Sequence, residues 1–367
     1  MSDVLNFQKQ LEDLHTLYPE VSVLDNAGKV VNQDLMPDLS DDELVELMKR
    51  MLWSRTLNDR SVVLAKQGKL GFFAPTAGQE ASQMASYFAF DKKDFLYPGY
   101  RDIPQLIQHG LPIYKAFLWS RGHAEGNIYP EDLKAMPPQI IIGAQIIQAM
   151  GTAIGMQKRG KQQVTFTYTG DGGSSQGDFY EGINYAGRFK APAVFFVQNN
   201  GYAISTPRFK QTAAVTIAQK AAAAGIPGVQ VDGMDALAVY AVTKAARDWA
   251  LAGNGPVLIE ILTNRFGPHS MSGDDPTIYR SKDDIKDWTE NHDPVSRFRN
   301  FVTDKGIWTE AMEEAYLEEV NEEITEAVKQ ADGIQKQKVS DFLKHTFEEP
   351  GYVIKEQIAY YEQKEAN

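Results

Sequence analysis

Two short clusters of glycine and oxygen-bearing residues could do chemistry in this sequence. Gly-Asp-Gly-Gly at 170–173 and Gln-Asn-Asn-Gly at 198–201 each follow a run of β-branched and aromatic residues. Asp171 offers a carboxylate, Asn200 an amide oxygen and the backbone near Tyr202 a carbonyl oxygen, and Mg²⁺ prefers such all-oxygen sets. Glycine leaves room for a diphosphate to approach backbone N–H groups. The inferred ligand is a magnesium diphosphate compound.

The elements that must position these clusters form one strand–helix–strand unit. We predict a buried strand at 164–169, a helix at about 177–190 and a second strand at 193–197. A crossover between neighbouring parallel strands brings both strand ends to the same edge of the sheet, so Asp171 and Asn200 should meet there. Open α/β sheets bind their ligands at this edge.

The rest of the chain predicts an α/β fold, with a mostly parallel sheet flanked by helices. Apolar runs at 229–231 and 256–262 indicate further strands, and the segment 236–251 between them is typical of a helix. These segments add a second strand–helix repeat to the same sheet.

The chain divides into three predicted parts. Residues 1–38 form an N-terminal arm that we expect to pack on a neighbour, and 39–305 form the α/β domain, which opens with a capping box of Ser40 and Glu43. Residues 306–367 form a helical C-terminal extension, packed on the same domain or on a partner.

Composition excludes several classes of function. The net charge of −12 opposes binding to nucleic acid or to anionic lipid, and no apolar run is long enough to span a membrane. The 367 residues include no cysteine, which excludes disulfides and thiolate sites. The N-terminus lacks the features of a signal or transit peptide, so we expect a cytoplasmic protein.

Each glycine cluster alone is an ordinary turn, but the combination is specific. Gly-Asp-Gly, a helix, a strand and then Asn-Asn is similar to the thiamine diphosphate motif. From about Leu39 to the C-terminus the chain resembles the alpha subunit of the decarboxylating component of 2-oxo acid dehydrogenase complexes. The matching stretches are GFFAPTAGQEAS, PGYRD, GAQIIQAMG, QNNGYAISTP, VDGMDALAVY and RFGPHSMSGDDPTIYRS. The resemblance implies the thiamine diphosphate-binding fold, with thiamine diphosphate and Mg²⁺ as cofactors.

The resemblance also assigns roles that the residues alone leave open. By themselves, Arg101 could form a surface salt bridge and His269 could be a solvated loop residue. The resemblance places Tyr100, Arg101 and Arg265 on the diphosphate, and it makes His269 a catalytic residue. The implied cofactor-binding residues are Tyr100, Arg101, Ile140, Ile142, Asp171, Gly172, Gly173, Asn200, Arg265 and His269, and the implied metal ligands are Asp171, Asn200 and Tyr202.

The sequence departs from the family pattern at two positions, and the roles of those two family residues are not transferred. Mitochondrial members have a histidine where Ala74 stands, so we give the loop around Phe72 and Phe73 no catalytic role, and Phe73 at most lines a pocket. Ser270 matches a serine that is phosphorylated in mitochondrial members, but Ile278 stands near the place of their second serine. We predict no dedicated kinase regulation.

The implied reaction is decarboxylation of a 2-oxo acid and transfer of the acyl group to a lipoyl group. In the family, the glutamate that activates the cofactor comes from another chain, and 367 residues hold only one module of the required kind. We therefore expect a beta subunit in an α2β2 heterotetramer, acting with a lipoyl-bearing dihydrolipoamide acetyltransferase core.

The substrate and one rival class of function stay open. The stretch Ile142-Gly143-Ala144-Gln145 is similar to the pyruvate type, which favours pyruvate over branched-chain 2-oxo acids or acetoin. A non-enzymatic nucleotide- or phosphate-binding module on the same sheet edge is the rival. The absence of GxGxxG after a first strand argues against a nicotinamide dehydrogenase.

Overall fold

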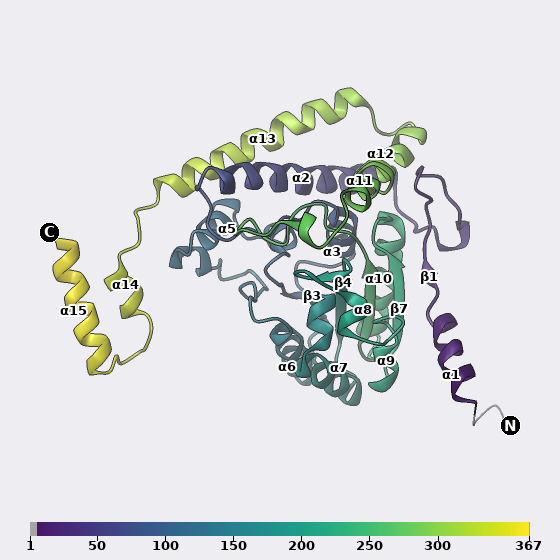
Figure 1. Ribbon diagram of the computed structural model, residues 1–367, viewed down its shortest axis with the longest axis horizontal. Coiled ribbons are helices and arrows are strands. Elements are labelled where there is room, and N and C mark those ends of the chain that lie inside the picture. Colours follow the sequence, from purple (N-terminus) through teal and green to yellow (C-terminus); the bar gives the residue numbers. More distant parts are fainter. Residues whose placement is uncertain (1–5, 367) are drawn as a thin grey trace.

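A six-stranded sheet forms the centre of the molecule (Figure 1). In the computed structural model, which describes residues 6–366, its strand order is β1-β7-β8-β4-β3-β2, and every neighbouring pair is parallel. The strands of this sheet are β1 (Glu20–Val21), β2 (Phe95–Tyr97), β3 (Thr165–Gly170), β4 (Ala193–Asn199), β7 (Gly228–Asp232) and β8 (Val257–Leu262). The prediction of a mostly parallel sheet is confirmed.

Helices cover both faces of this sheet, which confirms the predicted α/β class. The described helices are α1 (Phe7–Asp13), α2 (Asp41–Lys66), α3 (Ser86–Phe88), α4 (Ile103–His109), α5 (Ile113–Ser120), α6 (Ala144–Lys158), α7 (Gly177–Phe189), α8 (Arg208–Gln211), α9 (Lys220–Ala223), α10 (Ala236–Leu251), α11 (Lys282–Asn291), α12 (Pro294–Asp304), α13 (Glu310–Gly333), α14 (Val339–Lys344) and α15 (Tyr352–Ala366). None of them combines the length and the apolar character needed to cross a membrane.

The alternation of side chains along β4 explains the two helical layers. Val194 and Phe196 point into one apolar core, which they share with α2, α10 and α12. Phe195 and Val197 point into a second core, on the opposite face, which is shared with α6, α7 and α9. A strand buried on both faces reads as a continuous apolar run, which is the pattern of this stretch.

The unit β3–α7–β4 is the part of the fold that positions the predicted site. The two strands are neighbours, and Gly170 at the end of β3 lies opposite Gln198 near the end of β4. Helix α7 ends where Lys190 adopts a left-handed conformation with φ of 49°. The predicted strand–helix–strand unit is therefore confirmed, and it brings the two polar clusters to one edge of the sheet.

One strand of the N-terminal region belongs to the sheet of its own chain, and packing of this arm on a neighbour stays a prediction. Strand β1 pairs with β7, and Val23 and Leu24 are buried. Their backbone N–H groups both donate to the carboxylate of Asp235, at 2.7 and 2.6 Å. Residues 1–5 of the arm lie outside the described residues.

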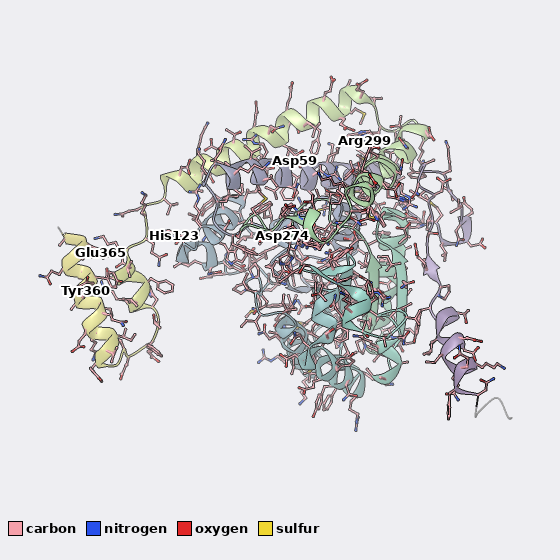
Figure 2. The ribbon with its side chains drawn as sticks, viewed as in Figure 1. Asp59, His123, Asp274, Arg299, Tyr360 and Glu365 are labelled. Atoms are coloured by element: carbon pink, nitrogen blue, oxygen red, sulfur yellow. The ribbon has the colours of Figure 1, made fainter. Side chains whose placement is uncertain are left out.

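The C-terminal region has two different relations to the body. Helix α13 packs along α2, where Arg60 donates to the Asn321 side chain at 2.8 Å and Trp53 to Glu323 at 3.0 Å. Helices α14 and α15 pack on each other and stand apart from the body in Figure 1. Tyr360 and Glu365, labelled in Figure 2, lie on this outlying hairpin.

Candidate active site

A cleft of about 400 Å³ opens at the carboxyl ends of β3 and β4. The ends of both strands line it, as the strand–helix–strand argument requires. The predicted site residues that line it are Tyr100, Arg101, Ile140, Ile142, Asp171, Gly172, Gly173, Asn200, Tyr202 and His269. All of the predicted site residues except Arg265 therefore line this cleft. Arg265 lies behind it and contacts His269, which is one of the lining residues.

Asp171 begins a 3₁₀ turn, Asp171–Ser175, directly after β3. Its side chain is buried, and one carboxylate oxygen accepts a hydrogen bond from Gln211 Nε2 at 2.7 Å. Burial raises the pKa of this carboxyl, whereas the Gln211 hydrogen bond lowers it. A bound cation would favour the ionised form that burial penalises.

The amide of Asn200 lies beside the same turn with its orientation held from two sides. Its Oδ1 accepts from Tyr202 N at 3.3 Å, and its Nδ2 donates to Gln79 Oε1 at 3.5 Å. This arrangement keeps the amide oxygen on the Tyr202 side. Asp171, Asn200 and Tyr202 thus line the same cleft, and they carry the carboxylate, amide and carbonyl oxygens that were predicted to bind Mg²⁺.

The two glycines after Asp171 allow the turn to pack closely against its neighbours. A Cβ at Gly172 would lie 2.7 Å from the Ala203 Cβ, and one at Gly173 would lie 1.9 Å from Thr169 Oγ1. No larger residue fits at either position unless the neighbouring atoms move. Close packing within the protein therefore favours glycine here, and the approach of a diphosphate to the same turn stays a prediction.

Two guanidinium groups converge on His269. Arg101 Nη2 lies 3.3 Å and Arg265 Nη1 3.1 Å from its Nδ1, and Arg101 also donates to the His269 carbonyl at 2.9 Å. Arg265 is 1% exposed, and its Nε has no hydrogen-bond partner among residues 6–366. Neither arginine forms an ion pair with a carboxylate in the described part of the chain. Buried positive charges of this kind fit an anionic ligand such as a diphosphate.

The environment of His269 keeps its imidazole neutral. Burial and the charges of Arg101 and Arg265 lower its pKa from 6.5 to about 4. Because Nδ1 faces two donors, it must act as the acceptor, and the ring proton lies on Nε2. The backbone N–H of His269 donates to Asp274, which also accepts from Tyr279 OH at 2.8 Å. In Figure 2, Asp274 lies on the main body of the molecule, away from the C-terminal helices that carry Tyr360 and Glu365.

We expect the pKa of His269 to rise when thiamine diphosphate and Mg²⁺ bind. Burial is the largest cause of the low value of about 4 and would remain, but the diphosphate would compensate the charges of Arg101 and Arg265, which lower the pKa further. Histidine NMR titrations of the protein with and without the ligand would measure the change, and the His269→Gln variant would assign the resonance. An unchanged pKa on binding would show that the ligand charge does not reach these arginines.

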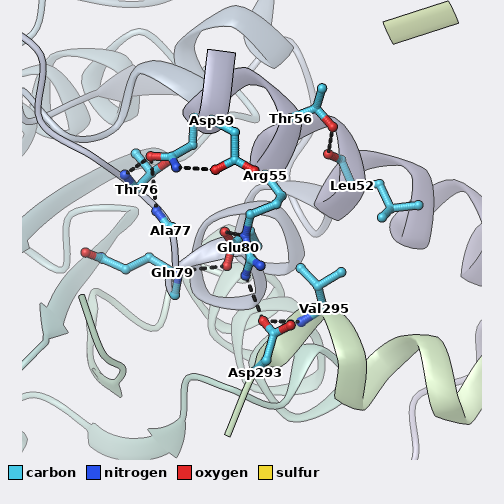
Figure 3. Close-up of polar contacts among 12 residues, drawn as sticks. Leu52, Arg55, Thr56, Asp59, Thr76, Ala77, Gln79, Glu80, Asp293 and Val295 are labelled. Carbon is cyan, nitrogen blue, oxygen red and sulfur yellow. Dashed lines mark hydrogen bonds and ion pairs between the residues drawn. The ribbon is translucent and has the colours of Figure 1, made fainter. Parts of the chain in front are cut away.

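An ion cluster of the partly exposed Arg55 with the buried Glu80 and with Asp293 fixes the loop 71–80 behind the cleft (Figure 3). Arg55 Nε lies 2.5 Å from a Glu80 oxygen, and its Nη2 lies 2.7 Å from Asp293. The second Glu80 oxygen accepts from Gly78 N at 3.0 Å. This Arg55 cluster holds the loop so that Gln79, which lines the cleft, contacts Asn200.

Phe72 adds an aromatic ring to the lining of the cleft, beside Tyr100 and Tyr202. Its ring packs edge-on against Tyr100, with centroids 5.7 Å apart, and it lines the cleft. Phe73, for which only a lining role was expected, lines a smaller pocket of about 20 Å³ behind Tyr100. Its carbonyl accepts from Met271 N at 2.8 Å and so ties the two loops together.

Several residues of the cleft were missed by reasoning from the sequence. Gln198 is the first polar residue after an apolar strand, a signal that could have found it. It donates to Asp102 at 2.7 Å, and burial raises the pKa of that carboxyl to about 6. Ile204 lines the cleft with φ of 56°, a strained conformation for a β-branched residue, and no local pattern predicts it. Gln211, the hydrogen-bond donor to Asp171, was missed as well.

Known proteins resemble this chain along nearly all of its length. The family described as dehydrogenase E1 component matches residues 48–340. A Staphylococcus aureus (strain Mu50) protein named pyruvate dehydrogenase E1 component subunit alpha is 58% identical over 358 residues, covering 98% of this chain and 96% of that protein. A Bacillus subtilis (strain 168) protein of the same name is 58% identical over 363 residues, covering 99% and 98%. For a Bacillus cereus protein of that name the identity is 57% over 363 residues.

Proposed function

The chain belongs to the dehydrogenase E1 component family, and we propose that it is the alpha subunit of a thiamine diphosphate-dependent pyruvate dehydrogenase (acetyl-transferring). It would decarboxylate pyruvate and acetylate the lipoyl group of an acyltransferase core. The observation that supports this best is the convergence of Arg101 and Arg265 beside Asp171 and Asn200, at the edge where the motif predicted a metal diphosphate. The names of the relatives favour pyruvate over branched-chain 2-oxo acids and acetoin.

The residues present fit the two cofactors. Arg101, Arg265 and Tyr100 would hold the diphosphate, and backbone groups near Ile140 and Ile142 would meet the aminopyrimidine ring. Residues 6–366 contain no group of three His, Cys, Asp or Glu that could hold a metal alone. Mg²⁺ would therefore depend on Asp171, the Asn200 amide, the Tyr202 carbonyl and oxygens of the diphosphate. When bound, thiamine diphosphate supplies the carbon nucleophile that attacks a 2-oxo acid.

The chain's own contribution to the reaction is positioning, charge and the exclusion of water. The neutral His269 imidazole lines the cleft with its proton on Nε2, so it would act as a hydrogen-bond donor to the reacting acyl group. Phe72, Ile142 and Ile204 provide apolar cover over the same space. Removing water there strengthens the interaction of both arginines with an anion.

We propose a beta subunit as the partner that completes the site, in an α2β2 heterotetramer. Ile140 and Ile141 are 55% and 73% exposed beside the cleft, and Tyr185 and Phe189 expose apolar surface on α7. The surface at Ile140 and Ile141 fits a second subunit that covers the cleft, and the surface on α7 fits a further contact away from it. The lipoyl-bearing acetyltransferase core, the cytoplasmic location and the lack of kinase regulation at the buried Ser270 stay predictions.

Calorimetry with thiamine diphosphate and Mg²⁺ tests this function. We expect tight binding and decarboxylation of pyruvate only when the chain is mixed with its beta subunit, because one half of the site is missing from the chain alone. Turnover of 3-methyl-2-oxobutanoate serves as the comparison and should be the slower of the two. A mixture that fails to bind, or in which a nucleotide displaces thiamine diphosphate, would instead support the non-enzymatic phosphate-binding module.

A further inference from the structure

Lys220, on α9, is a buried cation that the proposed reaction does not use. It is 6% exposed, and its Nζ donates to the Ser174 carbonyl at 2.7 Å and to Ser174 Oγ at 3.1 Å. The ammonium also lies 5.1 Å from the centre of the Tyr180 ring and 5.8 Å from that of Phe179. It forms no ion pair with a carboxylate within the described range 6–366. Burying an ammonium among neutral acceptors lowers the stability of the folded state, so fold stability does not explain a lysine at this position.

The partner of Lys220 belongs to the turn that carries Asp171. Ser174 lies in the 3₁₀ turn Asp171–Ser175, and its hydroxyl donates to the Asp171 carbonyl at 2.8 Å. A hydroxyl has one hydrogen and two lone pairs, so Ser174 can accept from Lys220 while it donates to Asp171. The two hydrogen bonds form a relay that starts at a charged group, and each bond polarises the next.

The carboxylate of Asp171 is held from another element. Gln211 on α8 donates to it at 2.7 Å and also donates to the Thr206 carbonyl at 3.1 Å. The backbone of Asp171 is thus fixed from α9 through Ser174, and its side chain is fixed from α8. Residues that orient a metal-binding carboxylate in this way determine how well it binds.

We propose that Lys220 is a positioning residue for the metal diphosphate site. Through Ser174 it locks the turn in the shape that presents Asp171, and it places a positive charge behind a turn that receives an anion. This inference rests on the proposed function in one respect, namely that Asp171 binds a metal with a diphosphate.

The test compares Lys220→Met with Lys115→Met in the full chain assembled with its beta subunit. Methionine keeps the apolar stem of lysine but removes the charge and the donors. Lys115 is the control for a buried lysine away from the cleft: it is 9% exposed, donates to the Ile128 carbonyl, pairs with Glu125 at 3.1 Å and does not line the cleft. The measurement is the dissociation constant of Mg²⁺, by calorimetry at saturating thiamine diphosphate, beside the melting temperature of each variant.

We expect Lys220→Met to weaken Mg²⁺ binding about 10- to 100-fold, the range for residues that orient metal ligands. Lys115→Met should leave the dissociation constant unchanged even where it lowers the melting temperature. Ser174→Ala, which keeps the lysine charge but removes the hydroxyl relay, should weaken Mg²⁺ binding in the same direction. Adding Lys220→Met to Ser174→Ala should cost less than the sum of the two single effects, because both act through one relay.

Three results would overturn the inference. The first is a dissociation constant for Lys220→Met equal to that of the unaltered protein. The second is an equal weakening by Lys115→Met, since the effect would then follow stability alone. If Lys220→Met does not assemble, Ser174→Ala decides, and unchanged Mg²⁺ binding by that variant is the third. Failure of the unaltered protein to bind Mg²⁺ and thiamine diphosphate would refute the proposed function itself, which separates the two cases.

Discussion

Replacing Asp171 by alanine is expected to abolish metal-dependent binding of thiamine diphosphate and to leave the fold intact. Asp171 is the only carboxylate among the predicted ligands, so the variant keeps only neutral oxygens from Asn200 and Tyr202. Loss of a residue that merely orients a ligand costs about 10- to 100-fold in metal affinity, so loss of the ligand itself should cost at least about 100-fold.

The fold should tolerate this change because the native carboxyl is not a source of stability. Burial raises the pKa of Asp171, which means that the folded state penalises its charge. Calorimetry with Mg²⁺ and thiamine diphosphate measures the binding, and thermal unfolding followed by circular dichroism measures the fold. Asp171→Asn is the control that keeps an oxygen of similar shape without the charge. Unchanged affinity in Asp171→Ala would remove Asp171 from the site.

Replacing Arg55 by leucine is expected to lower the free energy of unfolding by about 3–5 kcal/mol, the usual cost of breaking a buried ion pair from one side. The variant leaves Glu80 and Asp293, whose side chains are 0% and 14% exposed, facing each other without a cation. Although burial raises the pKa of Asp293, Arg55 holds it below its usual value. Without Arg55 that pKa should rise.

The pH dependence of this loss has a definite sign. Because the half-buried Asp293 can take up a proton when Arg55 is absent, the folded variant binds more protons than its unfolded chain as the pH falls towards the ordinary carboxyl pKa. The difference in stability between the unaltered protein and Arg55→Leu should therefore shrink from pH 7.5 to pH 5, as measured by urea unfolding.

The controls for this prediction distinguish a loss of stability caused by an unpaired buried charge from the loss caused by removing any ion pair. Arg299 and its partner Glu313 are 34% and 17% exposed, against 23% and 0% for Arg55 and Glu80, so Arg299→Leu leaves a solvated carboxylate and should cost only about 1 kcal/mol. Combining Arg55→Leu with Glu80→Gln and Asp293→Asn should recover part of the loss, because no charge is then left unpaired. An equal loss in Arg55→Leu and Arg299→Leu would contradict the role assigned to the Arg55 cluster.

The structure could be predicted from the sequence where neighbouring residues determine it. The strand–helix–strand unit around α7 follows from local periodicity, and the parallel crossover then places Asp171 and Asn200 at one edge. The capping box of Ser40 and Glu43 is local too, and the structure contains both of its hydrogen bonds. These predictions needed no knowledge of how distant segments meet.

Contacts between distant segments could not be predicted in this way. The convergence of Arg101 and Arg265 on His269 joins two loops, and only the resemblance to a family suggested it. The Arg55 cluster joins three segments, and nothing local marks its members as partners. Strand β1 has two residues and no periodicity, so its pairing with β7 had no signal in the sequence.

The strand order of the main sheet also determines when the molecule can fold during its synthesis. Strand β8, which ends at Leu262, lies between β7 and β4, so the last strand in the sequence fills the middle of the sheet. Until that segment leaves the ribosome, β4 lacks one of its partners and exposes an apolar strand edge, the kind of surface that promotes aggregation. The main sheet therefore cannot be completed until more than two thirds of the chain has been synthesised.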